Sequence, residues 1–216
     1  MTMTKPSIRL TALLAALVVA TTVLGACAPL LIGGAMVGGS MLAIDRRTSG
    51  AQIDDQTIEV KGIKRVNDTI GDRGSVSVTS YNHIVLLTGT VTNEADKAAV
   101  ERAVGAIESV RSVVNEIAIG AAASFGDRSS DTLLTGKVKA SFVDAKDLQV
   151  NAFKVVTERG VVYLMGRVTE REANRAANIA RGVSGVVKVV KVFEIVTEAE
   201  LADLQPRPAS APAAKP

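Results

Sequence analysis

The sequence predicts an α+β fold made of two tandem αββαβ modules, each a small three-stranded mixed sheet packed by two helices. First, residues 85–92 (VLLTGTVT) match residues 162–169 (VYLMGRVT) at an offset of 77 residues. Second, residues 75–79 alternate with the period of two that is typical of a half-buried strand. Third, an alanine-rich segment with helical spacing follows each copy of the repeat. A repeat at a fixed spacing indicates one duplicated supersecondary unit.

The first module is expected at residues 53–120. Its helix, strand, strand, helix and strand are expected at residues 54–66, 75–79, 84–91, 95–107 and 110–119, with a hairpin turn at 81–83. We interpret Asp54 and Asp55 as the acidic start of the first helix, because negative charge is favourable at a helix N-terminus. The second helix is expected to bury a face made of Ala95, Ala99, Ala103 and Ile107.

The second module is expected at residues 130–197, after a linker over 121–129. Its elements are expected in the same order at residues 131–143, 150–157, 161–168, 173–180 and 186–196, with a turn at 158–160. Asp131 would lie near the start of its first helix. Its second helix would bury Ala173, Ala177 and Ala180. Residues 198–216 are rich in Pro and Ala, which predicts a disordered tail.

The N-terminus has the layout of a signal peptide over residues 1–26. A basic start (Lys5, Arg9) precedes an apolar run over 10–24, which is shorter than the roughly twenty residues that a membrane span needs. The run ends at Leu24-Gly25-Ala26-Cys27, which holds the only cysteine of the chain. This ending resembles the lipobox of bacterial lipoproteins, in which the cysteine is acylated and becomes the first residue. The alternative is an ordinary secretory signal with an incidental cysteine.

Residues 27–52 are expected to form the tether that follows the lipidated Cys27. Residues 28–44 are apolar and contain the pairs Gly33-Gly34 and Gly38-Gly39. Paired glycines are costly in a regular element, which favours a flexible tether beside the bilayer. A hairpin that packs on or in the membrane through these small residues is the alternative.

Charge is divided unequally between the modules. Removal of residues 1–26 lowers the formal net charge from +3 to +1, so bulk charge does not indicate a nucleic-acid partner. Residues 54–119 carry seven Lys/Arg against ten Asp/Glu, whereas residues 130–196 carry eleven against seven. An anionic membrane would therefore prefer the second module, since each Lys or Arg near such a surface contributes about 1 kcal/mol. The alternative is that the charges are scattered over a solvated face.

The helix expected at 131–143 carries two apolar faces. Leu134, Val138, Phe142 and Ala145 have the spacing of a core stripe. The candidate lipid-binding residues lie on another side: Leu133, Gly136, Lys137, Lys139, Ala140 and Val143. Such a helix suits packing on a sheet while pressed into lipid headgroups, with the lysine stems snorkelling. Alternatively, Leu133 and Val143 pack against the first module.

Residues 54–61 (DDQTIEVK), 162–173 (VYLMGRVTEREA) and 183–186 (VSGV) resemble the BON module (bacterial OsmY and nodulation). The resemblance is to double-BON outer-membrane lipoproteins of the DolP/YraP type, and it covers nearly all of the chain after Cys27. It implies two αββαβ folds, an outer-membrane anchor facing the periplasm, and binding of anionic phospholipid through the second module. The family's glycines correspond to Gly89 and Gly166, which we interpret as structural, because a side chain there would obstruct close backbone approach.

Catalysis is not expected. His83 is the only histidine and Cys27 the only cysteine, which leaves no pair for metal ligation or for a nucleophile and its base. No glycine-rich turn joins a strand to a helix to hold a phosphate. We therefore expect no metal and no cofactor apart from the diacylglycerol and N-acyl chain on Cys27. A monomer is favoured, and the alternative function is an adaptor that docks outer-membrane assembly machinery or cell-wall enzymes.

Overall fold

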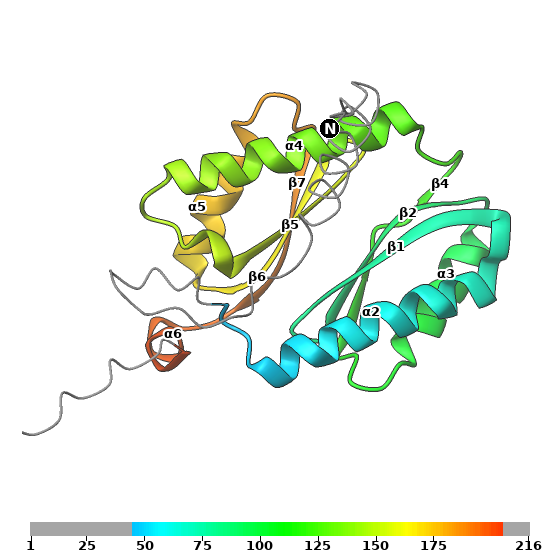
Figure 1. Cartoon of the computed structure of the whole chain (residues 1–216), viewed down its shortest axis with the longest axis horizontal. Coiled ribbons are helices and arrows are strands. Elements are labelled where there is room, and N and C mark those ends of the chain that lie inside the picture. Colours follow the sequence, from blue (N-terminus) through cyan, green and yellow to red (C-terminus); the bar gives the residue numbers. More distant parts are fainter. Residues whose placement is uncertain (1–44, 205–216) are drawn as a thin grey trace, which may run out of the picture. The chain divides into compact units, whose positions relative to one another are not determined.

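A computed structural model describes residues 45–204 of the chain, which form two sheets, each covered by helices (Figure 1). The expected signal peptide, Cys27, most of the tether and the tail from residue 205 lie outside these residues. The first module contains α2 (Ser49–Ile70), β1 (Gly74–Tyr81), β2 (Ile84–Val91), α3 (Glu94–Gly105), β3 (Ser112–Asn115) and β4 (Ala118–Ile119). The second contains α4 (Phe125–Asp144), β5 (Phe153–Glu158), β6 (Val161–Val168), α5 (Glu170–Arg181), β7 (Lys188–Ile195) and α6 (Glu198–Leu204).

Both sheets are mixed, which confirms the predicted fold class. In each module an antiparallel hairpin, β1–β2 or β5–β6, is extended by a strand that runs parallel to its second member. Both hairpin turns have two consecutive residues of positive φ, Asn82 and His83 in one and Arg159 and Gly160 in the other. Positive φ at both central residues is the geometry of type I′ turns, whose twist matches that of the flanking strands.

The strand expected at 110–119 is interrupted. It forms β3 and β4, which keep the same register against β2, since Leu87 aligns with Asn115 and Thr90 aligns with Ala118. Between them the Asn115 side-chain oxygen accepts a hydrogen bond from the Ile117 N–H at 3.2 Å, which takes the place of a ladder partner.

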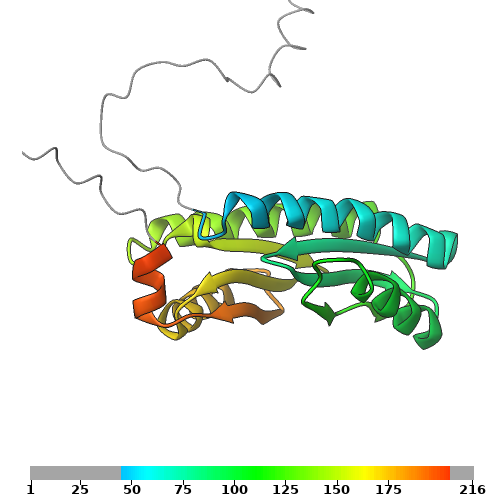
Figure 2. The same ribbon diagram turned by 90° about the horizontal axis from the view of Figure 1, so that it is seen from below.

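Three apolar clusters show which helices pack on each sheet and how the two sheets pack on each other. One joins α2 and α3 to one face of the first sheet, and a second joins α4 and α5 to one face of the second sheet. In the third cluster, Tyr81 and Leu86 of the first sheet meet Tyr163, Met165 and Val192 of the second. Burial in this cluster raises the pKa of both tyrosines to about 12. The helices α2 and α4 therefore lie on opposite outer layers, with both sheets between them (Figure 1). In the view of Figure 2 both helices run along the upper edge of the sheets, and α3 and α5 lie along the lower edge.

Polar contacts rim the cluster between the sheets. Asn82 donates to Glu194 at 2.6 Å, and Arg111 donates to the same carboxylate at 2.7 Å. Lys154 pairs with Glu59 at 2.7 Å. These contacts join residues far apart in the sequence, and the two modules form one compact unit.

The interpretation of Asp55 as a helix start is wrong. The helix α2 begins earlier, at Ser49, where the Thr48 hydroxyl accepts a hydrogen bond from the Ala51 N–H. Asp55 lies deeper in α2 and is buried, and its carboxylate accepts hydrogen bonds from the N–H groups of Asn82 and His83 at 2.7 and 2.8 Å. It holds the hairpin turn against the helix.

Asp131 likewise holds the hairpin turn of the second module against its first helix. The prediction that Asp131 lies near the start of that helix is therefore also wrong. Its two carboxylate oxygens accept from the N–H groups of Arg159 and Gly160 at 2.7 and 2.8 Å. The helix α4 begins at Phe125, where Ser124 and Asp127 form a capping box. Five residues of the expected linker are therefore helical. Likewise α6 forms, with Leu201 buried, where the disordered tail was expected to begin.

The buried faces of the second helices differ between the modules. In α5 the alanine face is buried as expected: Ala173, Ala177 and Ala180 are at most 1% exposed. In the first module Ile107 is buried as expected, but the alanine part of the face is wrong, because Val100 and Val104 of α3 are buried while Ala95 is exposed. Burial of the larger valines removes more apolar area from water than burial of alanines would.

Asp54 and Asp55 provide a matched pair of substitutions. We expect Asp55→Ala to lower the free energy of unfolding by about 3 kcal/mol, because it leaves several buried donors without an acceptor. Asp54→Ala should change it by less than about 0.5 kcal/mol, because the Asp54 side chain is 50% exposed. Urea unfolding monitored by circular dichroism measures both values. Equal effects would contradict the role assigned to Asp55.

Candidate functional site

The outer face of α4 carries large apolar side chains in solvent. Leu133 and Val143 are 69% and 65% exposed, and Gly136 and Ala140 between them are also exposed. Leu134, Val138 and Phe142, on the opposite side, are buried in the core of the module. The helix therefore has the two apolar faces that the sequence predicts. Since Leu133 and Val143 are exposed, they do not pack against the first module.

Lysines border this apolar stripe on both sides. At 3.6 residues per turn, Lys137 and Lys139 fall on opposite flanks of the line through Leu133, Gly136, Ala140 and Val143. Both lysines are exposed, and neither forms a salt bridge with any described residue. The face is therefore apolar along its centre, with one lysine on each edge and the exposed carboxylate of Asp144 at its C-terminal end.

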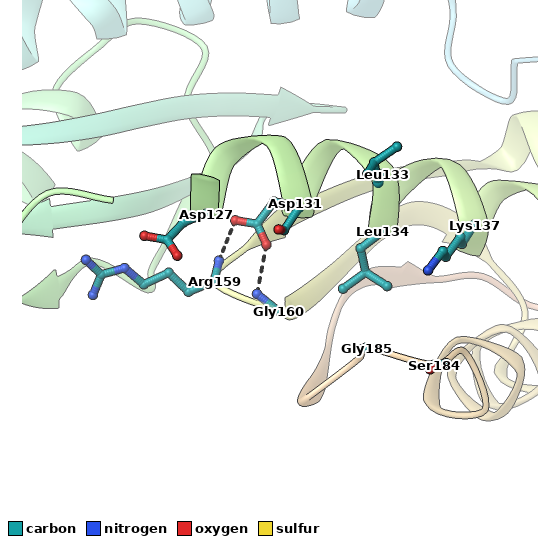
Figure 3. A pocket seen from close by; sticks show the side chains of 10 residues that line it. Asp127, Asp131, Leu133, Leu134, Lys137, Arg159, Gly160, Ser184 and Gly185 are labelled. Carbon is teal, nitrogen blue, oxygen red and sulfur yellow. Dashed lines mark hydrogen bonds between the residues drawn. The ribbon is translucent and has the colours of Figure 1, made fainter. Parts of the chain in front are cut away.

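A hollow of about 540 Å³ adjoins the N-terminal half of this face. Figure 3 shows that α4, the turn at Arg159 and Gly160, and the loop at Ser184 and Gly185 surround it. The side chain of Leu134 points toward Gly185, whereas Leu133 points away from it. The hollow is thus bounded by a lysine, an arginine and an exposed leucine.

The acidic groups around the hollow are held by the protein itself. Asp131 accepts from the two turn N–H groups, and Asp127 accepts from the Ser124 N–H and hydroxyl at 2.8 Å each, which lowers the pKa of Asp127. Behind the turn, burial and then repulsion from Asp131 raise the pKa of Glu158. The Arg159 guanidinium donates to the Ala121 carbonyl. Lys137 is left as a free cation at the mouth of the hollow.

The two expected structural glycines have steric causes. A Cβ at Gly89 would collide with the Ser75 carbonyl oxygen, and one at Gly166 would collide with the Ala152 carbonyl oxygen. Gly89 also has a φ of 112°, which side chains rarely permit. Neither glycine lies on the outer face of α4, so their place in the structure agrees with an architectural role.

Two arginines fasten the start of the described chain to both modules. Arg46 makes two hydrogen bonds to the Glu172 carboxylate, each 2.8 Å long, and donates to the Arg167 carbonyl at 2.9 Å. The Arg46 and Glu172 side chains are only 2% and 5% exposed. Arg47 pairs with Asp55 at 2.8 Å, and its guanidinium lies 4.3 Å from the centre of the Tyr81 ring. We call Arg46 and Arg47 the arginine clasp.

The arginine clasp was not predicted from the sequence, which assigned residues 27–52 to a tether. Two adjacent arginines after an apolar run are the only local signal, and nothing in their spacing indicates partners as distant as Glu172. The chain from residue 45 onward is therefore part of the folded unit. Any tether ends before it.

Within the described part of the chain, no cluster of three His, Cys, Asp or Glu residues could hold a metal ion. In residues 45–204, every helix falls short of the length or the hydropathy that a membrane span needs.

The BON domain model matches residues 54–121 and 130–197. The chain is 41% identical over 184 residues to outer membrane lipoprotein DolP of Haemophilus influenzae, covering 84% of this chain and 94% of that protein. It is 33% identical over 156 residues to the 21 kDa hemolysin of Actinobacillus pleuropneumoniae, covering 71% and 80%. The C-terminal domain of CdsD from Chlamydia trachomatis matches with a TM-score of 0.28 and 11% identity, over 62% of this chain and 97% of that one, which is too distant to carry an argument.

The chain therefore belongs to the BON domain family, and it carries two copies of the domain. The resemblance inferred from the sequence is confirmed.

The arginine clasp makes stability depend on pH. Burial alone would raise the pKa of Glu172, but hydrogen bonds from Arg46 and the Thr169 N–H outweigh it and lower the pKa. We expect Arg46→Met to cost about 3–5 kcal/mol near pH 7, because it leaves a buried carboxylate without its partner. A lowered pKa stabilises above the unfolded value, so this cost should shrink as pH falls below about 4.

Unfolding by guanidinium chloride at a series of pH values measures this cost. The exposed Arg171→Met is the control and should cost less than about 1 kcal/mol at every pH. A cost of Arg46→Met that does not change with pH would contradict the pairing with Glu172.

Proposed function

We propose that this protein is a non-enzymatic outer-membrane lipoprotein that binds anionic phospholipid through the outer face of α4. Acylated Cys27 would anchor it at the periplasmic side of the membrane, and its role would be to support envelope integrity. The observation that carries the proposal is the solvent-exposed apolar stripe of α4 with a free lysine on each flank.

The free energies that these side chains would contribute to membrane binding are of the size expected for reversible binding. Full burial of Leu133 or Val143 in an apolar environment would contribute about 1.5–3 kcal/mol each. Each flanking lysine near an anionic surface would add about 1 kcal/mol. Gly136 and Ala140 have little or no side chain, so the helix can approach the headgroups closely. A contact of this strength is weak alone and effective beside a lipid anchor, because stable membrane attachment takes two signals.

The relatives support the location. A protein 41% identical over most of the chain is named an outer membrane lipoprotein, and the Leu24–Cys27 motif has the layout of a lipidation site. Ala28 follows the cysteine where an acidic residue would weakly favour the inner membrane.

Vesicle binding by the chain from residue 28 onward tests the α4 face, since that chain holds all three apolar clusters. We expect it to co-sediment with anionic vesicles and poorly with neutral ones. Leu133→Asp with Lys137→Glu should lower binding at least about tenfold, because it removes an apolar anchor and reverses a charge.

The matched control lies 76 residues earlier, at the equivalent exposed positions of α2. Thr57→Asp with Lys61→Glu changes the net charge by the same amount and should leave vesicle binding unchanged. Equal binding to neutral and anionic vesicles, or equal losses in the two double variants, would reject the proposal.

Cys27→Ser tests the anchor. We expect the variant to lose incorporation of labelled palmitate in cells and to move from the membrane fraction to the soluble fraction, since no other thiol exists for acylation. Ala28→Ser, which leaves the cysteine in place, is the control. Retention of the label in Cys27→Ser would show that the signal is not a lipobox.

A further inference from the structure

A second apolar face lies on α2, on the opposite outer layer from α4. Ile53, Val60 and Ile63 are 64%, 70% and 49% exposed. Their spacing places them on one side of the helix, away from Ile58 and Val66, which are buried against the first sheet. These are large side chains that make no contribution to the core of their own module.

Cations line one border of this stripe. A hollow of about 570 Å³ lies between α2 and the end of α3, and three cations, Lys61, Lys64 and Arg65, line it together with the carboxylates of Asp68 and Glu108. Lys64 pairs with Asp68 at 2.7 Å, whereas Lys61 and Arg65, one helical turn apart, form no salt bridge with any residue of 45–204. Three of the seven Lys and Arg residues of 54–119 therefore line this hollow, against two of its ten Asp and Glu residues.

The pattern differs from that of α4. On α4 the free lysines flank the apolar stripe on both sides, as suits a flat sheet of headgroups. On α2 the unpaired cations Lys61 and Arg65 lie on the side toward α3, and Ile63 forms the other border. Because the unpaired cations lie on one border of the apolar stripe only, the face is complementary to an amphipathic helix that has an apolar stripe and a row of carboxylates along one edge.

The order of the layers leaves the outer face of α2 accessible when the outer face of α4 lies against a membrane. The helices α2 and α4 have both sheets between them, so their outer faces point in opposite directions (Figure 1). With α4 against a membrane, the α2 face is directed away from that membrane. A protein in solution can then reach it.

We propose that the outer face of α2, formed by Ile53, Val60, Ile63, Lys61 and Arg65, docks an acidic amphipathic helix of a partner protein. The apolar side chains provide the anchors, and the two unpaired cations fix the direction of the bound helix. This site is separate from the α4 face and does not require that lipid binds there.

A synthetic helix of about 18 residues, or five turns, provides a defined probe. It has a leucine stripe with glutamates along one edge, and a second peptide has lysines in their place. We expect the chain from residue 28 onward to bind the glutamate peptide at least about tenfold more tightly in calorimetry. Lys61→Glu with Arg65→Glu should reverse this preference, and Val60→Asp should remove binding of both peptides.

Lys137→Glu with Lys139→Glu makes the same charge change on α4 and is the matched control, which should keep the preference of the unchanged protein. The proposal is overturned if the unchanged protein does not prefer the glutamate peptide. It is also overturned if the α4 variant, rather than the α2 variant, reverses that preference. Loss of vesicle binding in Val60→Asp would also overturn the proposal, because it would show that α2 contacts lipid. A dimer that sedimentation detects and that Val60→Asp dissociates would overturn it as well, because the face would then bind a second copy of this chain.

The full lipidated chain in cells completes the test. A photoreactive residue at position 60 should form an adduct whose cross-linked peptide is acidic and amphipathic. The adduct should disappear in Lys61→Glu with Arg65→Glu and persist in Leu133→Asp with Lys137→Glu. An adduct to lipid or to a second copy of this chain overturns the proposal, whereas failure of vesicle binding alone overturns only the function proposed for α4.

Discussion

A carboxylate in the first helix of each module holds the turn of the hairpin that follows it. Asp55 and Asp131 each accept hydrogen bonds from two consecutive turn N–H groups, which the hairpin geometry leaves without backbone partners. The bond is charge-assisted and sheltered, and such bonds are about twice as strong as neutral ones. Together with the buried apolar residues of the same helix, it fixes how each first helix is rotated on its sheet. The outward direction of Leu133 and of Val60 follows from that rotation.

The two modules use this shared scaffold differently. In the first module Arg47 lies on Asp55, so the carboxylate also binds the arginine clasp and through it the start of the folded chain. In the second module Asp131 binds the turn and, among residues 45–204, no arginine, and the space in front of it remains a hollow beside Lys137. One copy of the duplicated unit therefore receives the chain that arrives from the N-terminus. The other keeps an open surface, to which we assign the lipid contact.

The face-to-face packing of the sheets gives the molecule two outer layers with different chemistry. Tyr81 and Tyr163 fill the space between the sheets, and Glu194 and Lys154 form its polar rim. Because each sheet uses its inner face for this contact, α2 and α3 cover the outer face of the first sheet and α4 and α5 that of the second. The exposed residues of α2 and α4 lie on these outer layers. A membrane contact on one layer and a protein contact on the other are compatible for that reason.

The sequence by itself determined the duplicated αββαβ fold, both hairpins, the alanine face of α5 and the two faces of α4, because each depends on a local periodicity. It did not predict the partners of Asp55, Asp131 and Arg46, since a hydrogen bond between Arg46 and Glu172, 126 residues apart, leaves no periodic signal. Asp54 and Asp55 show the limit most clearly. They are chemically identical neighbours in the sequence, and only the tertiary structure decides that one is solvated while the other is buried beneath a turn that needs its charge.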